Sequence, residues 1–484
     1  MAIKFLPSKM RKLFTIYFLF ITLFSFFGCS EKVEVSNIIE KQPCIFPDYN
    51  GVTLPYNIAP TNFAIEEEGE KYTVEIGKIG NDAIIVCNSS EPIVKIPEKK
   101  WRKLLEQSKG GNIYFRVYVQ KNNSWIKYDD IVNTISTEAI DPYLVYRLIY
   151  PGYELWKEMG IYQRNLTNFK EEVIVENRSL KHGCVNCHTF AKNSPNTMLL
   201  HIRGEAGGTV IVRDNCTIKT DMKVENMDSR GTYASWHPSG KYIAFSINVI
   251  NQYFHLTGKK PIEVIDLKSD LAIYDCETGE IFTDDKISGT KYMETFPNWS
   301  PDGETLYFCR ADSLDKNNDV NNVRYDLYKL NFNPITKEIS EPICVYKASD
   351  SLKSISFPRV SPDGQYILFT QSDYGNFSIW HPESELYLLN LKTNEVRNLI
   401  EVNSNDVESF HVWSSTGRWF VFSSKRMDGL WARPYFASFD PVTGKVTKPF
   451  IMPQKDPHFY NTFTKTYNLP ELITEPIKNK RNFK

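Results

Sequence analysis

The chain has almost no excess of charge of either sign. Its 57 Lys and Arg balance 58 Asp and Glu, giving a formal net charge of −1, and the absence of a basic surplus argues against a nucleic-acid partner. Cysteine and histidine are scarce, at nine and eight of 484 residues, and only one C-x-x-C pair exists. The missing second ligand pair argues against a structural zinc site. No G-x-S-x-G motif is present, which argues against a serine hydrolase.

The first 28 residues have the composition of a targeting segment. Four cations between residues 4 and 12 precede an apolar run over residues 13–27, which ends in Gly28-Cys29. The run is short and early for a transmembrane span and is typical of a secretory leader. It resembles a bacterial lipoprotein signal, which implies that Cys29 is lipidated and anchors the mature chain to a membrane. A retained leader is the alternative, and both place the body in the periplasm or at the cell surface.

The next two segments differ in pattern. Residues 29–50 are polar and aperiodic, so we expect a tether. Over residues 51–140, short alternating runs such as 72–76 and 112–119 are separated by turn residues, with one helical stretch around Trp101–Gln107. This pattern predicts a small β-sandwich, and it resembles an immunoglobulin or fibronectin type domain.

A repeated sequence pattern predicts the architecture of residues 190–484. Each copy has an aromatic residue, a turn such as Pro301-Asp302-Gly303, and then an apolar-x-apolar run. Such turns require positive φ at glycine and join antiparallel strands, and units of this length are typical of propeller blades. The copies resemble the TolB-like propeller family, which implies an all-β propeller over residues 190–484 with five recognisable blades. A sixth blade is plausible from residues near 142–180 and 455–484. The copies are Tyr233–Phe245, Phe296–Phe308, Phe357–Phe369 and Phe410–Phe422, with a degenerate one from Phe190.

Residues 141–189 form the expected connector, and they contain Cys184-Val185-Asn186-Cys187-His188. Two cysteines three residues apart lie on one side of a helical turn, so both thiols can bind the vinyl groups of one haem while His188 reaches the iron. We therefore expect one covalently attached haem c. A redox-active thiol pair, a zinc site and a local disulfide are the alternatives, and each lacks a supporting feature. Since the motif lies two residues before Phe190, we expect the haem near the mouth of the central channel.

The sixth iron ligand is left open by the sequence. His411 and Met293 lie where blades begin, Met198 and His201 follow the motif, and an open iron is equally possible. Four cations that follow the second strands of their blades are candidates for binding the haem propionates. They are Arg203, Arg310, Lys425 and Arg426.

Three functions remain compatible with these residues. The first is a lipid-anchored mono-haem cytochrome that transfers electrons or senses redox state, with a redox partner protein. The second is an envelope module that binds protein or glycan and whose haem is structural. The third is a haem enzyme with an open iron. A Met or His as sixth ligand favours the first, because saturated iron exchanges electrons without binding substrate.

Overall fold

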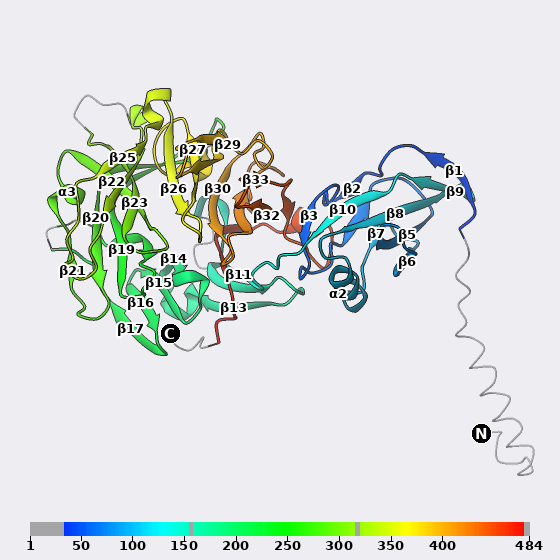
Figure 1. Cartoon of the computed structure of the whole chain (residues 1–484), viewed down its shortest axis with the longest axis horizontal. Coiled ribbons are helices and arrows are strands. Elements are labelled where there is room, and N and C mark those ends of the chain that lie inside the picture. Colours follow the sequence, from blue (N-terminus) through cyan, green and yellow to red (C-terminus); the bar gives the residue numbers. More distant parts are fainter. Residues whose placement is uncertain (1–32, 154–157, 226, 228, 315–319, 479–484) are drawn as a thin grey trace, which may run out of the picture.

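The computed structural model describes residues 33–153, 158–225, 227, 229–314 and 320–478. Figure 1 shows two bodies joined end to end, an N-terminal one in blue and cyan and a larger one in green to red. Both consist almost entirely of strands. The expected leader and Cys29 lie outside the described residues.

The N-terminal body is a β-sandwich, as the alternating runs predict. A seven-stranded sheet and a three-stranded sheet contribute to one apolar core. The larger sheet contains β1 (Val35–Ile39), β3 (Thr53–Pro55), β5 (Lys71–Lys78), β6 (Ile85–Ser89), β8 (Asn112–Lys121), β9 (Ser124–Tyr128) and β10 (Ile131–Ser136). The smaller sheet contains β2 (Ile45–Phe46), β4 (Phe63–Ile65) and β7 (Ile93–Val94).

Two details of the sandwich bear on the sequence predictions. The predicted helical stretch is α2 (Glu98–Gln107), which buries Trp101, Leu104 and Leu105. Residues 29–50, expected as a tether, contain β1 and β2. Strand β1 pairs with β9 in parallel and stays mostly exposed. Because such an edge strand is held by backbone hydrogen bonds, it needs no apolar pattern.

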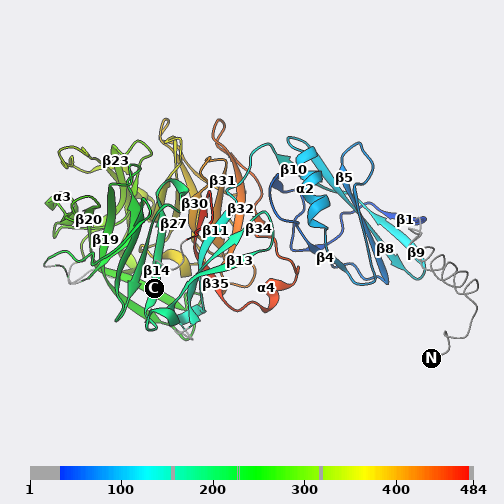
Figure 2. The ribbon, with the colours of Figure 1, turned by 90° about the horizontal axis from the view of Figure 1, so that it is seen from below.

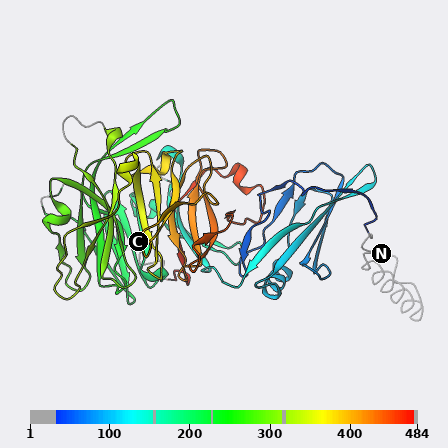
Figure 3. The same ribbon diagram turned by 45° about the horizontal axis from the view of Figure 1, so that its top comes forward.

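The larger body is a β-propeller in which the described residues form six sheets of four or five strands (Figure 2 and Figure 3). We number the blades by their innermost strands β14, β18, β22, β26, β30 and β35. Blades 1 and 2 are β14 (Cys184–Phe190), β15 (Thr197–Arg203), β16 (Gly208–Arg213), β17 (Cys216–Thr220), and β18 (Gly231–Trp236), β19 (Tyr242–Phe254), β20 (Ile262–Asp275), β21 (Ile281–Phe282). Blades 3 and 4 are β22 (Tyr292–Trp299), β23 (Thr305–Asp312), β24 (Asp326–Asn331), β25 (Ile343–Tyr346), and β26 (Ser354–Val360), β27 (Tyr366–Ser372), β28 (Glu385–Asn390), β29 (Val396–Asn398).

The last two blades close the ring. Blade 5 is β30 (Glu408–Trp413), β31 (Trp419–Ser424), β32 (Arg433–Asp440), β33 (Lys445–Val446) and β34 (Phe450–Ile451). Blade 6 joins the two ends of the propeller, because β35 (Thr466–Ile473) from the C-terminal side pairs with β11 (Tyr143–Ile149), β12 (Gly160–Asn165) and β13 (Glu171–Glu176). Short helices α3 (Asp285–Ser288) and α4 (Phe459–Thr462) lie in connections.

The blade pattern inferred from the repeat is present in the structure. The turn glycines Gly240, Gly303, Gly364 and Gly417 have φ between 66° and 81°. Each apolar-x-apolar run lies in the second strand of its blade, and its last residue is fully buried, as in Phe308 of β23. Packing of these rings between blades is what holds the propeller together.

Residues 141–189 do not form a separate connector. They supply three strands of blade 6 and the innermost strand of blade 1, with the C-x-x-C-H motif inside β14. The expected helical turn at Cys184 and Cys187 is therefore a strand. Pairing of β14 with β15 explains the difference, since it satisfies the backbone groups that a helical turn would otherwise use.

The sandwich packs against blades 5 and 6. A single apolar core runs through both bodies, and Asn62 of the sandwich donates a 3.1 Å hydrogen bond to the carbonyl of Lys455. The ion pair between Asp48 and Lys448, at 2.7 Å, lies at the same boundary. The sandwich therefore supports the outer side of the blade that closes the ring.

Candidate functional site

The central channel is narrowed by a collar of six side chains, one from each innermost strand. All six residues lie at a β-bulge with positive φ, between 38° and 54°, and together they surround one small cavity. A non-glycine residue in this conformation costs about 1–3 kcal/mol, and such strain gathers at functional sites. The collar consists of Cys187, Tyr233, Phe296, Phe357, Phe410 and Leu469.

Most of the collar is aromatic. The ring centroid of Phe296 lies 4.5 Å from that of Tyr233 and 4.4 Å from that of Phe357. The ring centroids of Phe357 and Phe410 lie 4.8 Å apart. In blade 1, Cys187 takes the place of an aromatic ring. The degenerate sequence copy had aligned Phe190 with Phe296. The structure shifts that alignment by three residues, because the bulge of β14 falls at Cys187.

The two cysteines of the motif are unpaired thiols in buried surroundings. Cys187 Sγ is hydrogen-bonded to Thr232 Oγ1 in blade 2 at 3.3 Å. Cys184 packs against Ile149 and Met159. Burial raises the pKa of the Cys184 thiol, and the positive charges of Arg147 and Arg203 partly offset this effect. Neither cysteine forms a disulfide.

His188, the last residue of the motif, is buried between blades 1 and 6. The imidazole is 3% exposed, and neither ring nitrogen forms a hydrogen bond of good geometry, although the carbonyls of Val145 and Leu469 lie close. Burial and the charge of Arg147 lower the pKa of His188 to about 3. The ring is therefore neutral at physiological pH and keeps a lone pair for a metal.

His411 provides an internal comparison, because it occupies the same position in blade 5, one residue after the collar. Its Nε2 donates a 2.9 Å hydrogen bond to the carbonyl of Leu368 in the preceding blade. Burial lowers the pKa of His411 to about 3 as well. His188 lies beside the two equivalent carbonyls of its own preceding blade, those of Val145 and Leu469. The two histidines differ in that the contact of His411 with Leu368 has good hydrogen-bond geometry and the contacts of His188 do not.

The residue types of the motif are those that would hold a c-type haem. The two cysteines are free thiols among the described residues, and the His188 imidazole is neutral. In the described conformation they do not face one side, since Cys187 contacts blade 2 while His188 faces blade 6. Attachment of one haem to these three side chains would therefore require a local change at the start of β14.

The structure does not bring the four sixth-ligand candidates together with His188. Met198 lies in the apolar core between blades 6 and 1, and Met293 Sδ accepts a 3.9 Å contact from the Tyr325 hydroxyl. His201 Nδ1 is bonded to Thr209 Oγ1 at 3.0 Å, and burial lowers the pKa of His201 to about 4. In the part of the chain that the structure describes, no group of three or more His, Cys, Asp or Glu side chains is arranged for a metal.

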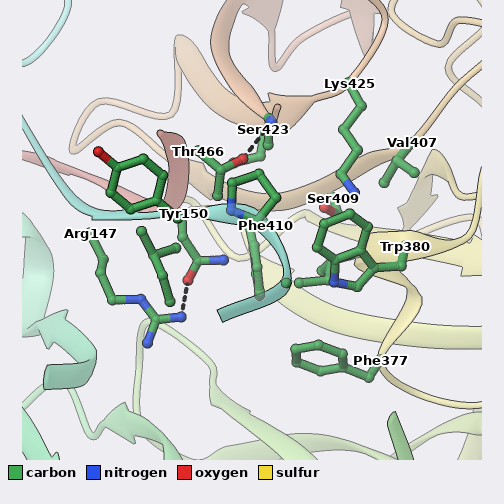
Figure 4. A pocket seen from close by; sticks show the side chains of 16 residues that line it. Arg147, Tyr150, Phe377, Trp380, Val407, Ser409, Phe410, Ser423, Lys425 and Thr466 are labelled. Atoms are coloured by element: carbon green, nitrogen blue, oxygen red, sulfur yellow. Dashed lines mark hydrogen bonds between the residues drawn. The ribbon is translucent and has the colours of Figure 1, made fainter. Parts of the chain in front are cut away.

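The four cations expected to bind haem propionates differ in their ion pairs and in their exposure. Arg310 pairs with Glu294 and Arg426 pairs with Glu408, both at 2.9 Å, and Arg203 is exposed. Lys425 is buried, and its ammonium group donates no hydrogen bond. It lines a pocket on the face where the innermost strands begin, which we call the top pocket (Figure 4).

A second opening lies on the opposite face, where the innermost strands end. This bottom funnel has a volume of about 430 Å³ and is lined by Trp236, Trp299, Arg359, Trp413 and Glu471, among others. The charges of Arg359 and Glu471 affect each other's pKa, but the two side chains form no ion pair. Burial raises the pKa of Glu471 to about 7, against the opposing effect of Arg359. Sequence inspection missed this funnel, because its residues come from separate blades.

One family model and several solved structures are similar to this chain. Residues 267–428 match the family model of the prolyl oligopeptidase N-terminal β-propeller domain. TolB from Acinetobacter baumannii is 11% identical, with 71% of this chain and 80% of that one covered and a TM-score of 0.39. A DUF4784 family protein from Bacteroides caccae is 8% identical, with 76% and 97% covered and a TM-score of 0.30. A puromycin-hydrolyzing peptidase from Mycobacterium tuberculosis is 11% identical, with 84% and 57% covered and a TM-score of 0.35.

No curated protein shows significant sequence similarity to the chain. The class of protein that the sheets define is an all-β protein with a β-propeller, and residues 267–428 of that propeller match the prolyl oligopeptidase N-terminal β-propeller model. The comparisons concern the scaffold, so the function has to be argued from the channel itself.

Proposed function

We propose that the protein is an exported, lipid-anchored mono-haem c-type cytochrome whose propeller holds the haem for electron transfer or redox sensing. Cys184 and Cys187 would bind the haem through thioether bonds, and His188 would be its axial ligand. The observation that carries the proposal is the spacing of Cys184, Cys187 and His188 together with the burial of the His188 imidazole, whose ring nitrogens form no hydrogen bond of good geometry within the described residues. When bound, the haem iron supplies one-electron exchange.

The surrounding residues prepare this position. Arg147 of β11 donates a 2.7 Å hydrogen bond to Asn186, one of the two residues between the cysteines of the motif. It donates another, at 2.8 Å, to Asn468 of β35. Arg147 thereby ties the motif to the closing blade, and burial together with the Arg147 charge keeps His188 neutral. The collar rings beside Cys187 exclude water from the same level of the channel.

The location outside the cytoplasm, in the periplasm or at the cell surface, is part of the proposal. It rests on the leader and on Cys29 as the lipidated residue, with a redox protein or an envelope component as partner. Within the described residues, no helix has the length and apolar character needed to cross a membrane.

Haem attachment is tested by producing the full chain in a host with active c-type maturation. The wild type should keep its pigment after acid-acetone extraction, because thioether bonds survive where coordination does not. The Cys184→Ser, Cys187→Ser double variant should be colourless. A control that replaces the two exposed cysteines Cys216 and Cys344 by serine should stay coloured. Pigment in the first double variant, or none in the wild type, refutes the proposal.

The bottom funnel favours a second candidate, an envelope-binding module with a structural haem. Arg359 and Glu471 face the open funnel without an ion pair, beside three tryptophan rings. Charged groups and aromatic rings in a hollow are suited to binding a polar ligand. If the haem is structural, Arg359→Gln should weaken binding of the cell-envelope component and leave the rate of haem oxidation unchanged.

A further inference from the structure

The top pocket contains a buried lysine that forms no ion pair with any carboxylate of the described residues. Lys425 is 4% exposed, and its ammonium lies 3.0 Å from the ring centroid of Trp380 without donating a hydrogen bond. Asp406 and Asp428 influence it from a greater distance, and neither forms an ion pair with it among the described residues. Figure 4 shows the side chain of Lys425 reaching into the pocket beside Trp380.

A second cation faces the same pocket from blade 6. Arg147 is 7% exposed, and the described partners of its guanidinium are neutral: the side chains of Asn186 and Asn468 and the carbonyl of Val185. None of the sixteen residues that line the pocket in the described part of the chain is Asp or Glu. The pocket therefore concentrates positive charge in a place shielded from water, where an anion is strongly favoured.

The size and walls of the pocket narrow down the anion. Its free volume of about 40 Å³ corresponds to a few water molecules, and one carboxylate group has a similar size. The pocket walls are aromatic, so they are suited to contact with a flat apolar group attached to the carboxylate. The wall residues are Tyr150, Phe377, Trp380 and Phe410. Ile149, which also lines the pocket, packs against Cys184 of the motif.

We infer that the top pocket binds the carboxylate of a flat, largely apolar ligand, with Lys425 and Arg147 as its anion-binding residues. A haem propionate is one source of that group, and a free aromatic carboxylate is the other. The propionate assignment rests on the proposed function and deepens it. It also selects Lys425 from the four cations that the sequence offered, because Arg310 and Arg426 already have carboxylate partners and Arg203 is exposed.

The test uses the full chain made in a host without c-type maturation, so that no haem is attached. Three probes are titrated: iron protoporphyrin IX, its dimethyl ester, and benzoate. Quenching of tryptophan fluorescence reports binding, since Trp380 lines the pocket. The diacid should bind about tenfold or more tightly than the ester, the effect of one charge-assisted hydrogen bond. Lys425→Met should remove that difference, and Lys445→Met, an exposed lysine of the same blade, should retain it.

Each outcome decides the inference. If benzoate binds with the same dependence on Lys425 while neither porphyrin binds, the carboxylate site stands and its ligand is a free acid. If the diacid and the ester bind equally, if Lys425→Met keeps the difference, or if no probe binds, the inference is overturned. Failure of the proposed function shows separately, as colourless wild type from the c-type maturation host.

Discussion

Replacing Lys425 by methionine should stabilise the haem-free protein. The ammonium is buried without a hydrogen bond, and methionine has a similar length and is apolar. Exchanging a buried charge for an apolar side chain of similar volume typically gains about 1–4 kcal/mol. Loss of the contact with Trp380 costs about 0.5–2 kcal/mol. The 1–4 kcal/mol range applies to buried ion pairs, and Lys425 lacks the partner that would offset its desolvation, so we expect a gain in the upper part of that range. After subtraction of the lost contact, the free energy of unfolding at pH 7 should rise by about 1–3 kcal/mol.

The pH dependence of this gain provides a sharper test. Burial lowers the pKa of Lys425 well below its usual 10.5. The folded protein therefore releases this proton at lower pH than the unfolded chain, so wild-type stability rises with pH until the unfolded lysine also titrates. The advantage of Lys425→Met should be greatest at low pH and vanish above about pH 10.5.

Urea unfolding followed by tryptophan fluorescence at pH 6, 7, 9 and 10.5 measures the difference. Lys445→Met serves as control and should stay within about 0.5 kcal/mol of the wild type at each pH, as expected for an exposed site. A Lys425→Met protein that is less stable than wild type at pH 7, or whose difference from wild type is independent of pH, would refute the reasoning about a buried, unneutralised cation.

Three further predictions concern other parts of the molecule. Because burial raises the pKa of Glu471 from 4.5 to about 7, wild type loses stability as the pH rises between these values. Glu471→Gln should be more stable than wild type by about 1–3 kcal/mol at pH 8 and equal to it at pH 4 in urea unfolding, and a gain at pH 4 would contradict this. Phe357→Ala should cost about 3–5 kcal/mol of unfolding free energy, since Phe357 packs between Phe296 and Phe410 in the collar, and a loss below about 1 kcal/mol would mean that the collar is loosely packed. Cys29→Ser should appear in the soluble fraction or keep its leader in mass spectrometry, whereas unchanged membrane association and mass would rule out lipidation.

Local sequence signals predicted the strands and turns of the propeller well. Each turn of the Pro301-Asp302-Gly303 type demands one backbone conformation, and each apolar-x-apolar run fits one buried strand. Blade 1 was harder to align, because Cys187 stands at the collar position that aromatic residues hold in four other blades. The three-residue shift became visible only through the pairing of β14 with β15.

The binding features depend on contacts between distant segments, which no local pattern encodes. Lys425 and Arg147 reach one pocket although 278 positions separate them along the chain (425 minus 147). The sequence offered Lys425 as one of four equivalent cations, and the structure distinguishes it by the ion pairs of Arg310 and Arg426 and by the exposure of Arg203. The C-x-x-C-H spacing identified the candidate residues, but it gave no information on the strand that contains them.

The central claim is that the chain carries one haem at Cys184, Cys187 and His188. The most direct measurement is the intact mass and visible spectrum of the full chain from a host with c-type maturation, for the wild type, His188→Ala and His411→Ala. The account predicts that all three retain one covalently bound haem, that His188→Ala alone loses the low-spin spectrum, and that His411→Ala matches the wild type because His411 is already bonded to Leu368. Wild type with the mass of the haem-free chain, or identical spectra for the two histidine variants, would contradict it.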